Sequence, residues 1–274
     1  MKHKTFRILS LVTLFILIFL SSIYDYFIKK DFKLSYRLIM KISPNFSLMI
    51  LSFSYMFIYR ITIYSSGILL SLLLCLIGDI FMGIYDPSIT DTSKNQMIYI
   101  LLGGSFFFLT RFLLVIVFAT KPYKRVSLIE YGWKKVVFTH IFFSIPFLIL
   151  GILNIWRDTS LTNIFVSAYI ITSFGIPLSY SFLRIGALNN FEIQESKISS
   201  LFGFLGMILF NLSDILLFIS LFTNWVKSYT LLISINIYWA SMYLITISMV
   251  RSSEEYVEKG KDYYPLQFTS PPDF

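Results

Sequence analysis

The chain has 274 residues, of which 56% are hydrophobic, 19% are aromatic and only 14% are charged. This balance excludes an ordinary soluble domain, in which about a quarter of the residues are charged, and it indicates a polytopic membrane protein. The formal net charge is +8 at pH 7, but the basic residues lie in short loops between apolar runs, which favours membrane topology and anionic lipid headgroups over nucleic acid as the explanation.

Apolar windows long enough to cross a bilayer recur along the whole chain. A spanning helix needs about 20 predominantly apolar residues. The sequence predicts an all-α bundle of eight transmembrane helices, over residues 8–24, 42–59, 61–85, 97–119, 136–155, 161–183, 199–222 and 228–250. We expect these helices to form one domain, residues 1–250, and the polar, proline-bearing residues 251–274 to be a disordered cytosolic tail.

The first window follows Lys2, Lys4 and Arg7 and so begins like a secretory signal. Its apolar core is long, and the sequence SSIYDYF after it lacks a small-x-small cleavage site, so we expect a retained helix. Lys and Arg are more frequent in the segments that would share a side with the two termini, which predicts both termini in the cytosol. The basic segment 25–41, on the opposite side, is the dissenting observation. The sequence does not distinguish the endoplasmic reticulum from the plasma membrane.

Two carboxylates lie inside apolar windows: Asp79 in LLLCLIGDIFM and Asp214 in MILFNLSDILLFI. A charge in hydrocarbon is costly unless it is paired, protonated or directed at a polar cavity. The two helices run the same way, and a rise of 1.5 Å per residue puts the acids roughly 9 and 12 Å from the outer ends of their helices. Other helices would aim polar side chains at the same layer, namely Lys41, Ser43, Asn45, Arg111 and Tyr238.

This polar layer has two interpretations. Asp79, Asp214 and Arg111 could form a buried ion cluster that pins helices together. Alternatively, they could surround a polar cavity that opens toward the headgroups. Two neighbouring carboxylates cannot both ionise cheaply, so in such a cavity one would stay protonated and act as a proton donor. The residues alone leave both interpretations open.

Several other kinds of site can be excluded or reduced to packing. The chain has two histidines, His3 and His140, so a three-histidine zinc site is excluded. A Ser-His hydrolase would have to use His140, and no G-x-S-x-G elbow presents a serine. The single cysteine, Cys75, has no disulfide partner and is expected to be a small core residue.

Five further residues in the apolar helices are expected to serve helix packing. Gly103 and Gly104 favour a close helix contact, and Pro146 and Pro177 favour kinks. An interhelical hydrogen bond is the simplest use of Asn211.

Four stretches in chain order resemble the lysoplasmalogenase-like (YhhN) membrane proteins, which have eight helices. They are MKISPNF with Lys41 and Pro44, SLLLCLIGDIFM with Gly78 and Asp79, GMILFNLSDILL with Gly206, Phe210, Ser213 and Asp214, and YWASMYLIT with Tyr238 and Tyr243. The third stretch is the most specific of the four. Their order and spacing cover nearly the whole chain.

The resemblance implies an integral membrane hydrolase that cleaves the vinyl ether bond of lysoplasmalogens to a fatty aldehyde and a glycerophospho-base. It implies Asp79 and Asp214 as the catalytic pair, a lysophospholipid substrate surrounded by membrane lipids, and no metal or organic cofactor. We expect Lys41, Arg111, Tyr238 and Asn211 to contact the substrate. The sequence does not indicate an oligomeric state.

The chain departs from the family pattern at two positions. Arg111 stands where a histidine is usual, and Met242 stands where helix eight usually has glutamine. An arginine beside two carboxylates favours their ionised forms, so the alternative function is a catalytically inactive member that binds or transports lipids.

Overall fold

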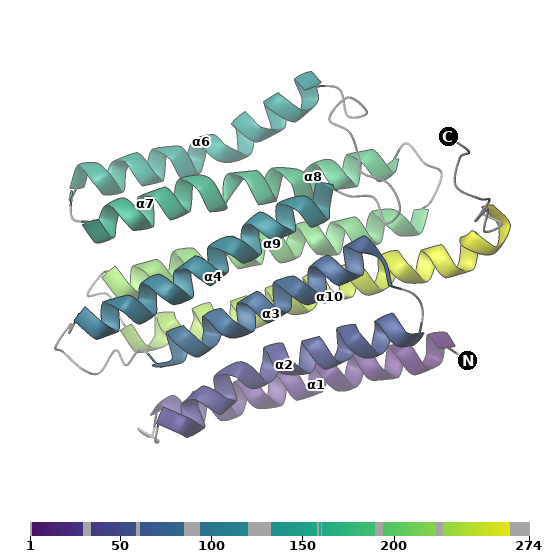
Figure 1. Cartoon of the computed structure of the whole chain (residues 1–274), viewed down its shortest axis with the longest axis horizontal. Coiled ribbons are helices and arrows are strands. Elements are labelled where there is room, and N and C mark those ends of the chain that lie inside the picture. The colour runs from purple at the N-terminus through teal and green to yellow at the C-terminus, as the bar shows by residue number, and fades with distance from the viewer. Residues whose placement is uncertain are drawn as a thin grey trace, which may run out of the picture.

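The chain folds into an array of long helices (Figure 1). The computed structural model describes residues 2–29, 34–58, 61–84, 94–119, 133–157, 159, 161–189, 194–222 and 227–263. Within this part every element is an α-helix, so the all-α prediction is confirmed. The elements are α1 (Lys2–Lys29), α2 (Leu34–Ile58), α3 (Ile63–Ile84), α4 (Lys94–Ala119), α6 (Trp133–Arg157), α7 (Leu161–Ser173), α8 (Gly175–Asn189), α9 (Gln194–Phe222) and α10 (Lys227–Tyr263).

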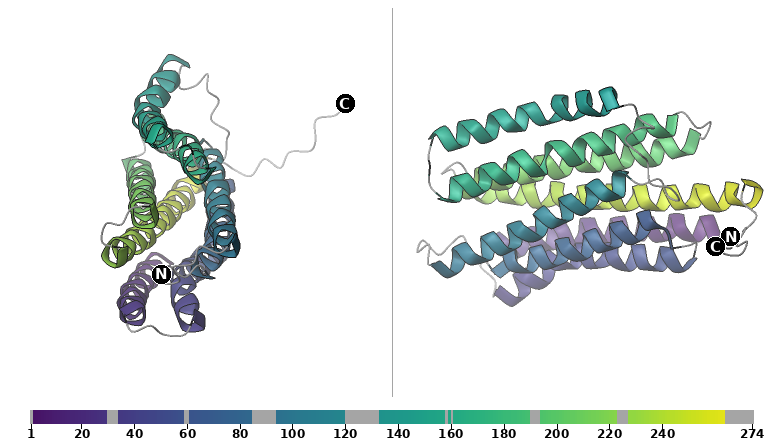
Figure 2. Two further views of the ribbon diagram at one scale, coloured as in Figure 1. Left: turned by 90° about the vertical axis from the view of Figure 1, so that its left-hand side faces the viewer. Right: turned by 45° about the horizontal axis from the view of Figure 1, so that its top comes forward.

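α7 and α8 form one broken rod, so the described helices correspond to the eight predicted windows. Successive rods run in opposite directions, and the start of α1 and the end of α10 lie at the same end of the bundle (Figure 1). Figure 2 shows that the array is curved rather than flat when it is viewed along the helices. The prediction that both termini share one side is therefore consistent with the observed topology.

The described helices include 6 segments that are long and apolar enough to cross a membrane, in α3, α4, α6, α7 with α8, α9 and α10. Residues 8–20 of α1 form a shorter apolar helix. α2 carries Lys41, Pro44 and Asn45 within its first half and packs between α1 and α3. The protein is thus a multi-pass membrane protein.

The helical part of the chain extends beyond residue 250. α10 continues to Tyr263, so the described part of the expected tail is helical. Residues 264–274, the rest of the expected tail, lie outside the described residues.

Glycines set the closest helix contacts. Gly78 of α3 and Gly103 of α4 face each other: a Cβ on Gly103 would lie 2.6 Å from Cγ of Met82 and 3.2 Å from the carbonyl oxygen of Gly78. The prediction that the Gly-Gly pair permits close helix packing is confirmed for Gly103. For Gly104 the nearest atom would be 3.6 Å away, on Phe165, which is an ordinary contact.

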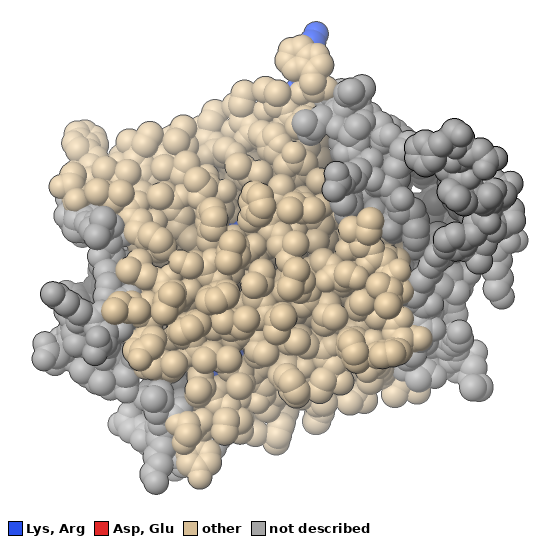
Figure 3. Space-filling model, in the orientation of Figure 1, with Lys and Arg blue, Asp and Glu red and all other residues tan. Residues whose placement is uncertain are grey.

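The surface is apolar and much of the interior is polar, as expected of a protein in lipid. The face in Figure 3 is almost entirely tan where it is described, with basic atoms at its upper edge. Large side chains such as Phe57, Phe138 and Trp156 are 77%, 70% and 84% exposed. By contrast, Asp79, Arg111 and Asp214 are buried.

Candidate functional site

Asp79 is the centre of one buried polar network, which joins three helices. It lies on α3 and is 1% exposed. The Asn45 side-chain amide, on α2, donates to Asp79 and also, at 2.6 Å, to the Tyr238 hydroxyl. Tyr238, on α10, donates its own hydroxyl proton to the same Asp79 oxygen at 3.0 Å. Both of these hydrogen-bonding partners are neutral.

Lys41 supplies a positive charge beside this network. It lies one helical turn before Asn45 on α2 and is partly buried. Its Cδ would be 3.6 Å from a Cβ placed on Gly83 of α3, so its stem packs along that helix. Its ammonium group interacts electrostatically with Asp79. Lys41 therefore lies one helical turn nearer the start of α2 than the Asp79 network.

Asn45 also offers an acceptor. Among the described residues its Oδ1 atom has no hydrogen-bond partner, although it is buried. A buried acceptor without a partner is unusual in proteins. Asn45 can therefore take a hydrogen bond from a hydroxyl group of a bound molecule while its amide nitrogen holds Asp79 and Tyr238.

Asp214, on α9, is the centre of a second network, and this one contains a full ion pair. Nη2 of Arg111, on α4, lies 2.7 Å from Oδ2 of Asp214, and the Tyr169 hydroxyl of α7 donates to the same oxygen at 2.8 Å. Arg111 also donates through Nη1 to Asn211 and through Nε to the Tyr169 oxygen at 3.3 Å. The guanidinium group thereby connects α4 with α7 and α9 through charge-assisted hydrogen bonds.

The break between α7 and α8 completes the surroundings of Arg111. Pro177 has no N–H to donate to the carbonyl of Ser173, four residues earlier. That carbonyl lies 3.5 Å from Nη1 of Arg111, and the carbonyl of Phe174 accepts from Asn211 at 3.3 Å. The predicted distortion at Pro177 is confirmed, and the carbonyl groups at the break bind Arg111 and Asn211.

Aromatic rings lie between the two networks. Arg111 is positioned over the Phe174 and Phe210 rings, at 4.6 and 4.0 Å from their centroids. Phe210 in turn packs at 5.7 Å against Tyr238, the partner of Asp79. Phe107 contacts both Phe210 and Tyr238. Packed aromatic rings therefore connect the network of Asp79 with the network of Asp214.

This arrangement corrects the hypothesis of one ion cluster containing Asp79, Asp214 and Arg111. Among the described contacts Arg111 pairs with Asp214, whereas Asp79 has Asn45 and Tyr238 as its hydrogen-bonding partners. The physical reason is the direction in which the Arg111 side chain extends. The Arg111 guanidinium group packs on the Phe210 ring and bonds to side chains of α7 and α9, whereas Tyr238 and Asn45 occupy the positions around Asp79.

The other predicted site residues are distributed between the networks. Asn211 makes the expected interhelical hydrogen bonds, within the Asp214 network. Met242, at the position where glutamine is usual, lies beside Cys75, with the sulfur atoms 3.8 Å apart. His140 belongs to neither network and pairs with Ser179 of α8.

Two important residues were not among the predicted site residues. Tyr169 was not singled out, although the Phe-Gly-x-Pro break just after it marks a place where a polar partner is needed. Asn45 was assigned to the polar layer without a role. Its hydrogen bonds to Asp79 and Tyr238 depend on how three helices meet.

The fold and the two buried networks define the protein as a polytopic helical membrane protein with an ionisable centre inside the bundle. The model of the YhhN family matches residues 36–249. The match covers most of the chain, so the protein belongs to the YhhN family, as the sequence motifs indicated. No curated protein and no solved structure matches the chain.

Proposed function

We propose that the protein is a membrane hydrolase that cleaves the vinyl ether bond of a lysoplasmalogen, with Asp79 as the proton donor. The observation that carries the proposal is the environment of Asp79. A carboxyl group buried at membrane depth has neutral hydrogen-bond donors on two sides and a lysine beside it. Intramembrane acids of this kind mark functional sites, since their burial is costly.

The proposed reaction has three steps. Asp79 gives its proton to the vinyl carbon that is not bonded to oxygen, which leaves an oxocarbenium ion on the other vinyl carbon. The Asp79 carboxylate then accepts a proton from water as the water oxygen attacks that cation. The resulting hemiacetal breaks its C–O bond to the glycerol while its hydroxyl proton passes to the departing glycerol oxygen, which gives a fatty aldehyde and a glycerophospho-base. Asn45 and Tyr238 hold the carboxyl group in place throughout.

Asp214 has a different role in this proposal. Its charge is matched by Arg111, and both side chains are held by Tyr169 and Asn211. We therefore do not assign it as the proton donor. We assign it as a positioning residue that fixes Phe210 and, through the ring contact, Tyr238.

The test is aldehyde release from lysoplasmenylethanolamine by the purified protein in detergent. Asp79→Asn keeps a similar shape and removes the proton donor, so its turnover should fall by about 100-fold or more. Tyr243→Phe, which changes a partly buried tyrosine on α10 outside both networks, is the matched control. Full activity in Asp79→Asn would refute the assignment.

One observation favours a second candidate, a lipid-binding or transport-like protein without turnover. Arg111 neutralises the acid that the family resemblance places in the catalytic pair. This candidate predicts that a folded wild-type protein binds lysophospholipid and releases no aldehyde. The same assay separates the two functions when lipid binding is measured beside it.

A further inference from the structure

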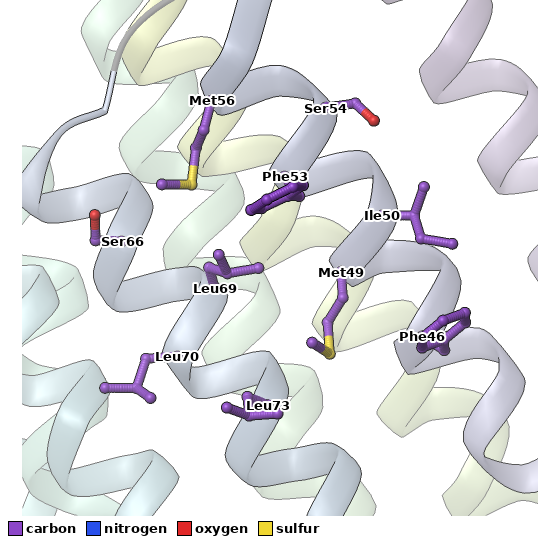
Figure 4. A pocket seen from close by; sticks show the side chains of 10 residues that line it. All are labelled: Phe46, Met49, Ile50, Phe53, Ser54, Met56, Ser66, Leu69, Leu70 and Leu73. Atoms are coloured by element: carbon purple, nitrogen blue, oxygen red, sulfur yellow. The ribbon is translucent and has the colours of Figure 1, made fainter.

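The buried ion pair is closed off from the surface of the bundle. An open groove lies between α2 and α3 on the apolar surface, where Met49 of α2 lies opposite Leu73 of α3 (Figure 4). Among the described residues, the lining of this groove contains no member of either polar network. Asp214 is only 6% exposed and Arg111 is fully buried, so a molecule can meet this pair only after helices move apart.

Two neighbouring rods are each weakened at one point. In α6, Pro146 has no N–H to donate to the carbonyl of Phe142. In the rod of α7 and α8, Pro177 leaves a carbonyl without its helical partner in the same way. The backbone hydrogen bonds that Phe174 and Leu178 donate around this break are long, at 3.4 Å, compared with about 2.9 Å in a regular helix. Each rod can therefore bend at its proline.

The two weak points lie side by side. A Cβ placed on Gly175, at the break, would lie 2.6 Å from the Cα atom of Ser144 in α6. Each of these two residues precedes the proline of its own rod by two positions. Bends at one level in two packed helices allow the segments beyond them to turn together, as hinged segments do in other proteins.

The segments beyond the two bends are fastened to each other. They are residues 147–157 of α6 together with α7, and they form the edge hairpin. The side chain of Asn154 donates to Ser167 across it at 3.0 Å, and a Cβ on Gly151 would lie 2.6 Å from Cγ1 of Ile171. α6 lies at the edge of the array, beside α7 (Figure 1). The edge hairpin can therefore move as one body without displacing a further helix.

Tyr169 fastens the edge hairpin to the rest of the bundle. Its hydroxyl group donates to Asp214 of α9 at 2.8 Å and accepts from Arg111 of α4 at 3.3 Å. Its ring packs against Phe218, also on α9, with the centroids 5.5 Å apart. Arg111 further lies 3.5 Å from the carbonyl of Ser173, at the bend itself. One hydroxyl group thus joins the hairpin to both members of the ion pair.

We propose that the edge hairpin is a lateral gate, which turns about Pro146 and the break before Pro177 and is latched by the Tyr169 hydroxyl to Arg111 and Asp214. Opening the gate uncovers the ion pair between α7 and α9. The 13 residues of α7 span about 20 Å, so a turn of about 20° moves the far end of the hairpin by about 7 Å. The gate goes beyond the proposed reaction, since Asp79 takes no part in it.

The test measures the position of the hairpin with pairs of spin labels. Thr159→Cys labels the far end of the hairpin, and Ile98→Cys labels α4 near the same end of the bundle; both positions are exposed. Phe138→Cys on α6 and Ile116→Cys on α4 form the control pair, on the other side of the bends. The native Cys75 is buried. Distances are measured by double electron–electron resonance on the full-length protein in detergent.

Tyr169→Phe keeps the ring and removes the latching hydroxyl group. In this variant the distance between the labels at positions 159 and 98 should gain a second population, longer by about 7 Å, whereas the control pair should keep its distribution. Tyr243→Phe, which removes a partly buried hydroxyl outside the hairpin, should leave both pairs unchanged. Adding Pro146→Ala to Tyr169→Phe restores the missing N–H and should reduce the second population.

Two results would overturn the proposal. One is a folded Tyr169→Phe protein with the wild-type distribution, and the other is an equal broadening of both label pairs, which indicates general loosening of the bundle. If Tyr169→Phe does not fold, Pro146→Ala alone decides: it should narrow the distribution between positions 159 and 98, and a width equal to that of the wild type would overturn the hinge. Failure of the proposed function is distinguishable, because the absence of aldehyde release leaves these distances unaffected.

Discussion

At the scale of single residues, Arg111 has the largest predicted effect on stability. Replacing it by glutamine removes the cation and leaves the buried Asp214 carboxylate with Tyr169 as its remaining hydrogen-bonding partner among the described residues. Breaking one side of a buried ion pair costs about 3–5 kcal/mol. We expect Arg111→Gln to unfold at a clearly lower temperature or denaturant concentration than the wild type, measured in the same detergent.

The double variant Arg111→Gln with Asp214→Asn is the control, since it removes both charges and should recover part of the loss. Wild-type stability in Arg111→Gln would show that the pair does not hold the helices together. The cost of intramembrane charges was sufficient to predict that Arg111 has a partner. It was not sufficient to predict which acid that is, because the choice depends on Phe210, Tyr169 and the freed carbonyl of Ser173.

At the scale of helices, the two adjacent glycines of α4 give a matched comparison. Gly103→Ala places a methyl group against the backbone of Gly78 and the side chain of Met82, whereas Gly104→Ala makes only an ordinary contact with Phe165. Overpacking of this kind costs about 1–3 kcal/mol. Gly103→Ala should therefore be destabilised in thermal unfolding and Gly104→Ala should not. Equal stability of the two variants would contradict the close contact of α3 with α4.

Apolar windows in the sequence were sufficient to place the helices, and Pro177 was sufficient to indicate the break between α7 and α8. The end of α10 at Tyr263 was not predictable in the same way. The hydropathy of the sequence indicates where a helix leaves the lipid. It does not indicate where the helix ends, because a helix can continue into water when its polar residues favour it.

At the scale of the whole molecule, the alternating helices fix which loops share a side. Ile61, between α2 and α3, lies at the end of the bundle that holds the start of α1, and Thr159, between α6 and α7, lies at the opposite end (Figure 1). The native Cys75 is buried. In sealed microsomes, whose cytosolic face is on the outside, an impermeant thiol reagent should therefore label Ile61→Cys, and it should label Thr159→Cys only after permeabilisation.

Labelling of both variants from one side would contradict the alternating topology, and the inverted pattern would contradict the orientation expected from the basic residues. The alternating direction of successive helices follows from the spacing of the eight apolar windows along the sequence. The groove between α2 and α3 does not follow from that spacing, because it depends on how Met49 and Leu73 pack across two helices.

The most direct test of the account is turnover of lysoplasmenylethanolamine in deuterium oxide, with the aldehyde product analysed by mass spectrometry. Protonation of the vinyl carbon by Asp79 predicts an aldehyde with one deuterium on the carbon next to the carbonyl, formed by the wild type and lost in Asp79→Asn. Folded wild-type protein that forms no aldehyde, or forms it without deuterium at that carbon, would contradict the account.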